Sequence, residues 1–254
     1  MSAGNTVVLN SPSQQNSQKG YNMALIELKN VNKKYHSGEV IVNAARDITL
    51  EITEGSFVAF VGPSGSGKST LLNLVGCLDM PTSGSISILG TKVDSLDRVA
   101  RAKFRGDHLG FIFQNFSLIP VLTVYENIEY PLVMVKNLPK EERQEKVRSL
   151  LEKVGMLDQM NKYPNQISGG QKQRAAVARA LVSNPKIVLA DEPTANLDSE
   201  SAMQVIKVMH RMQEELGTTF IFSTHDQKIV EEAEIIYHLK DGVIVDRIDR
   251  KLRA

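Results

Sequence analysis

The chain has 254 residues, 42% of them hydrophobic and 23% charged, which is ordinary for a soluble globular protein. The length fits one large α/β domain or two small ones, and a net charge of +1 gives no argument for nucleic acid as a partner. The single cysteine, Cys77, excludes an intramolecular disulfide and a cysteine-based zinc site. No apolar run approaches the roughly 18–20 residues that span a bilayer, and the N-terminus has no signal-peptide pattern. We therefore expect a cytosolic protein that reaches a membrane only through a partner.

The N-terminal part divides into a polar segment and a region of short strands. Residues 1–22 are polar with little periodicity, so we expect a disordered extension there and a folded domain at 23–254. Alternating apolar residues predict short antiparallel strands, at 26–31, 48–52 and 85–89.

A glycine-rich segment then connects an apolar strand at 57–61 to an apolar helix at 71–75. It fits the pattern G-x-x-x-x-G-K-S of a phosphate-binding loop, in which backbone N–H groups and the positive end of the helix point at phosphate. Lys68 supplies a charge for the β- and γ-phosphates, and Ser69 offers a hydroxyl to Mg²⁺. The alternative is a glycine-serine turn that matches by chance, which the fixed offsets of Lys68 and Ser69 disfavour. We expect the whole segment to bind phosphate: Gly62, Pro63, Ser64, Gly65, Ser66, Gly67, Lys68, Ser69 and Thr70.

The second half of the chain alternates helices with apolar strands. Apolar stripes at helical spacing, together with capping residues, predict helices at 139–154, 171–181 and 198–217. Short apolar runs predict strands at 187–190, 220–222 and 235–237. Strands separated by helices of this length imply a mostly parallel sheet covered on both faces.

Two carboxylates follow the strand at 187–190. In phosphate-loop ATPases an aspartate at such a strand end holds Mg²⁺, and Asp191 fits that role. Glu192 is expected to point elsewhere because side chains alternate on a strand, and it can accept a proton from a water aimed at the γ-phosphorus. Alone, a solvated strand end would be an equally good interpretation; the phosphate loop favours the catalytic one.

The alanine-rich helix opens with Ser168, Gly169, Gly170 and Gln171, where free N–H groups and the helix dipole favour an anion. With Ile167 in place of leucine, this stretch resembles the L-S-G-G-Q signature of the ATP-binding-cassette (ABC) ATPases. The resemblance covers roughly residues 24–245, with six motifs in the family's order. It implies an α/β fold with a phosphate-loop NTPase (RecA-like) core and mostly parallel sheet, an antiparallel β-subdomain, and an α-helical subdomain at about 115–165.

The resemblance also implies roles for single residues around ATP and Mg²⁺. Tyr35 looks like the aromatic residue that stacks on adenine, although a core or surface tyrosine is the alternative. Gln114 looks like the glutamine that contacts Mg²⁺ and the attacking water, and His225 like the histidine that contacts the γ-phosphate. Asp198 matches the family's S-A-L-D loop, whose first positions differ here.

In the ABC family the signature of one subunit covers the ATP held by the other. The resemblance therefore implies a head-to-tail dimer, expected to be of identical ATPase subunits, which hydrolysis loosens. It further implies an integral membrane permease as partner, which would hold the chain at the cytoplasmic face of the inner membrane.

Segments 76–84, 113–120 and 123–128 resemble the macrolide-efflux and lipoprotein-releasing (MacB/LolD) group, which implies export or lipoprotein and lipid extrusion. The cassette that serves a cell-division permease is a near neighbour and stays as an alternative. A soluble ABC ATPase of DNA repair, chromosome structure or translation is the competing class. It is disfavoured because the interval of about 100 residues from Lys68 to Ser168 holds no heptad run.

Overall fold

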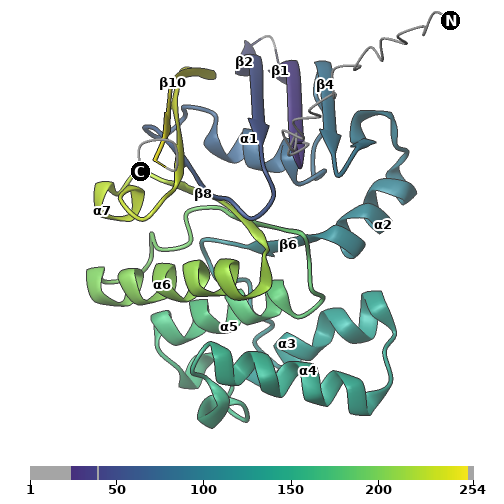
Figure 1. Ribbon diagram of the computed structural model, residues 1–254, viewed down its shortest axis with the longest axis vertical. Coiled ribbons are helices and arrows are strands. Elements are labelled where there is room, and N and C mark those ends of the chain that lie inside the picture. Colours follow the sequence, from purple (N-terminus) through teal and green to yellow (C-terminus); the bar gives the residue numbers. More distant parts are fainter. Residues whose placement is uncertain (1–23, 39, 251–254) are drawn as a thin grey trace, which may run out of the picture.

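The structure, a computed structural model, describes residues 24–38 and 40–250. The extension expected at 1–22 lies outside these residues. The described chain contains two β-sheets, and several of its helices gather at the end of the molecule away from the antiparallel sheet (Figure 1).

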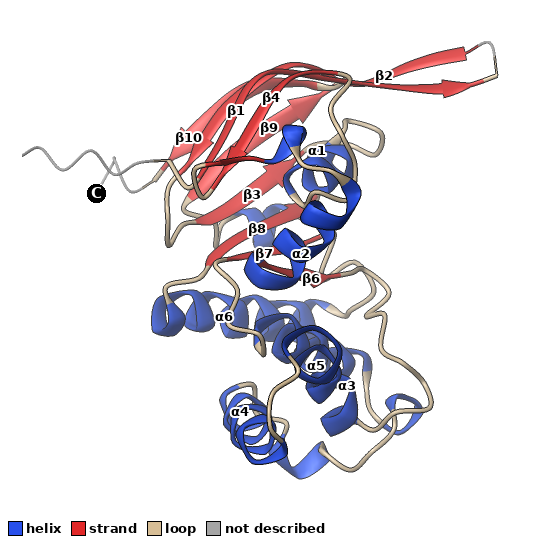
Figure 2. Cartoon of the chain, turned by 90° about the vertical axis from the view of Figure 1, so that its right-hand side faces the viewer, coloured by secondary structure: helices blue, strands red, loops and turns tan. Residues whose placement is uncertain are grey.

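The first sheet is antiparallel and has the strand order β2-β1-β4-β5. Its strands are β1 (Ile26–Ser37), β2 (Val40–Ile52), β4 (Ser83–Ile88) and β5 (Thr91–Lys92). β1 and β2 run well beyond the predicted ranges and form a hairpin that projects from the body (Figure 2). The register of this hairpin places Tyr35 opposite Val42.

The second sheet has the order β10-β9-β3-β8-β7-β6. Its strands are β3 (Phe57–Val61), β6 (Leu109–Ile112), β7 (Ile187–Ala190), β8 (Thr219–Thr224), β9 (Ile235–Lys240) and β10 (Val243–Asp249). All its pairings are parallel except that of β10 with β9, which confirms the predicted mostly parallel sheet. The carboxyl ends of parallel strands lie at one edge of a sheet, and ligands of open α/β folds bind there.

The longer helices are α1 (Lys68–Val75), α2 (Arg98–His108), α3 (Val124–Pro131), α4 (Lys140–Lys153), α5 (Gly169–Leu181) and α6 (Ser199–Leu216). Shorter turns are η1 (Val93–Ser95), the π-helix η2 (Leu132–Lys136), η3 (Leu157–Gln159), η4 (Pro164–Gln166) and α7 (Gln227–Val230). α3 and α4 lie on the far side of α5 and α6 from the sheets (Figures 1 and 2). No described helix is both long and apolar enough to cross a membrane.

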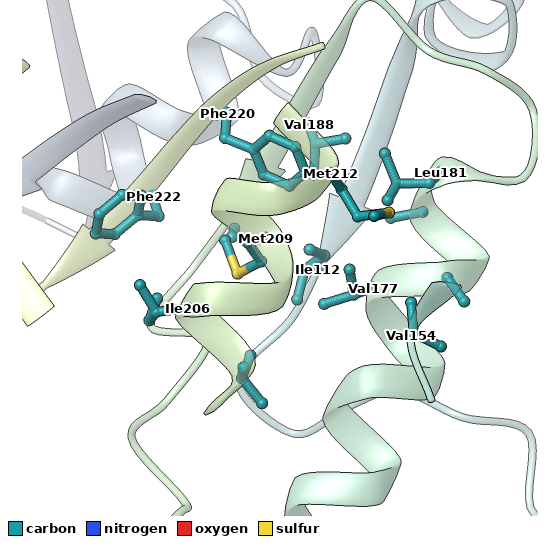
Figure 3. Packing of buried hydrophobic residues seen from close by; sticks show 14 of the residues in the cluster. Ile112, Val154, Val177, Leu181, Val188, Ile206, Met209, Met212, Phe220 and Phe222 are labelled. Carbon is teal, nitrogen blue, oxygen red and sulfur yellow. The ribbon is translucent and has the colours of Figure 1, made fainter. Parts of the chain in front are cut away.

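The parallel sheet separates two hydrophobic clusters. Along β3, Phe57 and Ala59 face the cluster that contains α5 and α6, whereas Val58 and Phe60 face the cluster with α1 and the antiparallel sheet. Every side chain of β3 is buried, as the predicted apolar run requires. Figure 3 shows part of the first cluster, in which Met209 and Met212 of α6 pack with residues of the sheet.

Candidate active site

A cavity of about 1000 Å³ opens where the carboxyl ends of several parallel strands meet the antiparallel sheet. The structure brings most of the predicted site residues to its wall, namely Tyr35, Pro63, Ser64, Gly65, Ser66, Gly67, Lys68, Ser69, Thr70, Gln114, Asp191, Glu192 and His225. It adds residues that no motif indicated: Val42, Asn43, Ala44, Arg46 and Asp241. The added residues come from β2 and from the turn between β9 and β10.

The loop between β3 and α1 lies tightly against its neighbours. Gly67 precedes α1 with a φ of 101°, a conformation that only glycine adopts readily. A Cβ atom on Gly67 would lie 2.4 Å from the carbonyl oxygen of Ala44, and one on Gly62 would lie 2.2 Å from that of Leu239. Both positions need glycine, because a side chain at either one would clash with a backbone carbonyl group. Gly62 is not among the residues that line the cavity.

Lys68 begins α1 and is almost fully buried, at 6% exposure. Its Nζ donates hydrogen bonds to the carbonyl oxygens of Gly62, at 2.8 Å, and Pro63, at 3.1 Å. The same Nζ lies 3.6 Å from Oε1 of Glu192. The ammonium group is thus held at the wall close to a carboxylate and to the N-terminus of α1, where an anion is favoured.

Asp191 links the phosphate loop to β8 through hydrogen bonds. Its Oδ1 accepts hydrogen bonds from Oγ of Ser69, at 3.0 Å, and from Oγ of Ser223, at 2.6 Å. Ser223 lies near the end of β8, is fully buried, and also accepts a hydrogen bond from the backbone N–H of Glu192 at 2.8 Å. Sequence reasoning missed Ser223 because its role depends on how β7 and β8 pair.

Glu192 lies between a lysine side chain and a histidine side chain. Its Oε2 lies 2.8 Å from Nδ1 of His225, while Lys68 approaches the other oxygen. As expected, Glu192 and Asp191 have different partners, although strand alternation is not the cause because β7 ends at Ala190; both carboxylates line the cavity. Glu192 instead has a φ of 46°, which is uncommon for a residue with a side chain.

Tyr35 borders the cavity from the β1–β2 hairpin. Its hydroxyl donates a hydrogen bond to Oδ2 of Asp79 at 2.7 Å, and Nζ of Lys33 lies 4.8 Å from the ring centre. Lys33 also donates to Oδ1 of Asp79 at 2.6 Å. Burial and the hydrogen bond to Asp79 raise the pKa of Tyr35, although the Thr70 side chain acts in the opposite direction. The ring is held at the cavity edge by the half-buried Lys33 and the carboxylate of Asp79.

The remaining predicted site residues do not line the cavity. Ser168 caps α5, with its Oγ accepting from the N–H of Gln171 at 3.3 Å and Gln171 Oε1 accepting from the N–H of Ser168 at 2.9 Å. Asp198 caps α6 by accepting from the N–H of Ser201 at 2.9 Å, and this bond lowers the pKa of Asp198. A Cβ on Gly169 would lie 3.2 Å from Leu197, so the starts of α5 and α6 are close together. The face next to Gly170 is closed in the same way, by Ser201 of α6.

Three side chains near the phosphate loop carry oxygen atoms that fit as ligands of a magnesium ion. They are the hydroxyl of Ser69, the carboxylate of Asp191 and the side-chain amide of Gln114, all on the cavity wall. Mg²⁺ prefers oxygen ligands and usually keeps phosphate and water oxygens in its shell, so a small protein contribution is what it requires.

Comparison with known proteins identifies many similar sequences. The family model described as ABC transporter matches residues 45–195. An uncharacterized ABC transporter ATP-binding protein of Methanocaldococcus jannaschii, MJ1508, is 48% identical over 89% of this chain and 100% of its own length. The macrolide export ATP-binding/permease protein MacB 1 of Yersinia pestis is 45% identical over 87% of this chain but only 34% of its own length.

Solved structures include close matches to the fold. The ATP-binding cassette MJ0796 of M. jannaschii, a dimer in a post-hydrolysis state bound to ADP and Pi, has a TM-score of 0.82 and 43% identity over 89% of this chain and 98% of its own. CbiO1 from Clostridium perfringens, part of the ABC transporter complex CbiONQ, has a TM-score of 0.82 and 31% identity over 91% of this chain and 90% of its own.

Proposed function

Because this chain belongs to the ABC transporter family, as an ATP-binding and ATP-hydrolysing subunit, we propose that its 1000 Å³ cavity is the nucleotide site. The observation that carries this proposal is the cluster of Lys68, Glu192 and His225 beside the Ser69–Asp191 hydrogen bond. The cluster places Lys68, which can bind phosphate, and the carboxylate of Glu192, which can contact a water molecule, in the same cavity.

In this site the phosphate loop and Lys68 bind the β- and γ-phosphates, and the ring of Tyr35 stacks on the adenine. Ser69, Asp191 and Gln114 would hold Mg²⁺, which when bound neutralises charge on the phosphate oxygens. Asp191 is oriented for this by two hydroxyl donors, Ser69 and Ser223.

Glu192 is the general base of hydrolysis. Its carboxylate takes a proton from the water that attacks the γ-phosphorus, while the bond from that phosphorus to the β–γ bridging oxygen breaks and yields ADP and phosphate. The 2.8 Å contact with His225 orients Glu192 and brings the histidine to the γ-phosphate side of the cavity. Gln114 orients the same water.

Two copies of the chain complete each site. The signature residues Ser168, Gly169, Gly170 and Gln171 lie outside the cavity of their own chain, and so does Asp198. The dimeric state of the related cassette MJ0796 supports an arrangement in which they cover the ATP held by the partner, head to tail. The free N–H groups at the start of α5 then face the partner's γ-phosphate.

The membrane partner is an integral permease, and the chain works at the cytoplasmic face of the inner membrane, in export of the MacB type. The relative MacB 1 is an ATP-binding/permease protein, which supports this assignment. A groove of about 390 Å³ next to the Gln114 loop, lined in part by Phe113, Pro131 and Val135, offers an apolar seat for a permease segment.

The substitution Glu192→Gln tests the site. It removes the base but keeps the shape, so ATP binding persists while turnover falls at least 100-fold, within the range that general base catalysis contributes. Single-turnover phosphate release and fluorescent-ATP binding measure the two quantities. Glu200→Gln, an exposed carboxylate on α6, serves as the matched control with unchanged turnover. Rapid phosphate release by Glu192→Gln would remove Glu192 as the base.

A further inference from the structure

Arg179 connects the signature helix to the loop that carries Gln114. It lies in the last turn of α5, at the opposite end from Ser168. One guanidinium nitrogen donates to the carbonyl oxygen of Phe116 at 3.0 Å, and another donates to that of Ser117. None of the described carboxylates forms an ion pair with Arg179, so its charge is directed at these two carbonyl groups.

The two residues that Arg179 holds are in an unfavourable conformation. Phe116 has a φ of 61° and Ser117 a φ of 48°, successive left-handed residues without glycine. This conformation is strained for a residue with a side chain, and it persists only when surrounding contacts enforce it. Burial lowers the pKa of Arg179, and a desolvated guanidinium makes stronger hydrogen bonds than an exposed one.

Gln114 lies two residues before this turn and is held from the other side as well. The side-chain amide of Asn196, just before α6, donates to the carbonyl oxygen of Gln114 and to Oδ1 of Asn115, both at 3.0 Å. Gln114 therefore lies between an anchor from the loop before α6 and an anchor from α5. Arg179 and Ser117 also line the groove of about 390 Å³ next to the Gln114 loop, so a segment bound in that groove would contact Arg179.

We propose that Arg179 is a positioning residue for Gln114: it holds the strained Phe116–Ser117 turn and so fixes the loop that presents Gln114 to the reacting phosphate. The inference rests on the proposed role of Gln114 in hydrolysis. Because the same side chain belongs to α5, it also links movement of the signature helix to the placement of Gln114. Loss of Arg179 leaves the phosphate loop and Tyr35 in place, so it affects the rate of hydrolysis and not the binding of ATP.

The test is a double-mutant cycle of Arg179→Met with Gln114→Ala, with single-turnover phosphate release and ATP affinity as measurements. Arg179→Met keeps the length of the side chain and removes its donors, and we expect turnover to fall about tenfold or more, the size of a lost charged hydrogen bond. The ATP affinity stays within about twofold, since no phosphate or base contact is changed. In the Gln114→Ala protein, Arg179→Met has no further effect on turnover.

Arg174→Met is the matched control on the same helix. The guanidinium of Arg174 also reaches backbone carbonyls, those of Val154 at 3.4 Å and Gly155 at 3.5 Å, but these lie far along the chain from Gln114. We expect its turnover to equal that of the unmodified protein. If Arg179→Met does not fold, as judged by thermal unfolding, Arg179→Lys takes its place in the cycle, with a smaller loss of turnover that again disappears in the Gln114→Ala background.

Two results would overturn the inference: one shows that the role of Arg179 is wrong, and the other that the role of Gln114 is wrong. If Arg179→Met lowers turnover by the same factor with and without Gln114→Ala, Arg179 acts independently of Gln114 and the positioning role is wrong. If Gln114→Ala alone leaves turnover unchanged, the proposed role of Gln114 fails, and Arg179 has no catalytic group to position.

Discussion

Tyr35 illustrates how one side chain at the cavity edge depends on residues from elsewhere in the chain. Lys33 lies on the same strand, whereas Asp79 lies in the loop after α1, so the contact joins the antiparallel sheet to the phosphate-loop helix. Burial works to raise the pKa of Asp79, but hydrogen bonds from Lys33, Tyr35 and the N–H of Met80 together lower it. A depressed carboxyl pKa stabilises the native state above the unfolded value of about 3.9, and this contribution is lost only as the pH falls through the lower folded pKa. The Tyr35 contact therefore persists throughout the neutral pH range.

Asp79→Ala should weaken the binding of ATP by about three- to tenfold, because the Tyr35 ring loses the hydroxyl anchor that sets its orientation toward adenine. Tripolyphosphate has no base, so its affinity should be unchanged. Isothermal titration with both ligands separates the two contributions. Asp107→Ala provides a control, since Asp107 forms an ion pair with Lys136 at 3.0 Å and does not line the cavity. An equal loss of affinity for tripolyphosphate would show that Asp79 acts on the phosphate loop instead.

Some residues of the cavity wall could be predicted from the sequence and others could not. The phosphate loop is recognisable because its backbone needs glycine and lysine at fixed short offsets. Arg46 and Asp241 were missed because they meet only through the packing of β2 on the β9–β10 turn, where Nε of Arg46 donates to the carbonyl oxygen of Asp241 at 2.9 Å. Val42 was missed for a similar reason, since it faces Tyr35 only through the hairpin register.

Among the helices, α5 combines a structural cap with the proposed dimer contact in one residue, Ser168, and the two roles can be separated. Aspartate is as good a helix cap as serine, so Ser168→Asp should preserve the unfolding temperature. Its carboxylate would repel the partner's γ-phosphate, so turnover should fall at least tenfold. Thermal unfolding and phosphate release are the measurements.

Ser168→Ala and Asp97→Ser complete this comparison. Ser168→Ala removes the cap and should destabilise the fold by about 0.5–2 kcal/mol. Asp97 caps α2 by accepting from the N–H of Ala100 at 2.8 Å, so Asp97→Ser exchanges one cap for another away from the site and should leave turnover unchanged. Full activity of Ser168→Asp would argue against a place for Ser168 at the partner's phosphate.

Three helices with a buried stripe were predicted within a few residues, whereas α3, which buries Val124 and Ile128, was not. α4, α5 and α6 match their predicted ranges because apolar spacing and caps mark both their bodies and their ends. α2 was missed because it buries a single side chain, Phe104. The strand predicted at 48–52 is shorter than β2 because residues 40–44 of β2 are largely exposed and carry no alternation of buried and exposed side chains.

For the whole molecule, the alternation of strands and helices was enough to predict a mostly parallel sheet, which the structure confirms. The strand order was not predictable, because β3 lies between β8 and β9, which come more than 150 residues later in the chain. That order is what collects the phosphate loop, Asp191 and His225 at one edge.

The separation of the signature residues from the cavity makes a prediction about assembly. If each ATP is enclosed by two copies, hydrolysis requires an encounter between chains, so turnover per mole of protein should rise with protein concentration until the dimer saturates. Glu192→Gln should form a stable dimer with Mg²⁺-ATP and return to monomer with ADP, because the γ-phosphate is the group that both copies contact. Light scattering coupled to size-exclusion chromatography measures the mass in each state. Turnover per mole that stays constant over a wide concentration range, in a protein that remains monomeric with ATP, would mean that one copy completes its own site and that the start of α5 must move to the cavity within a single chain.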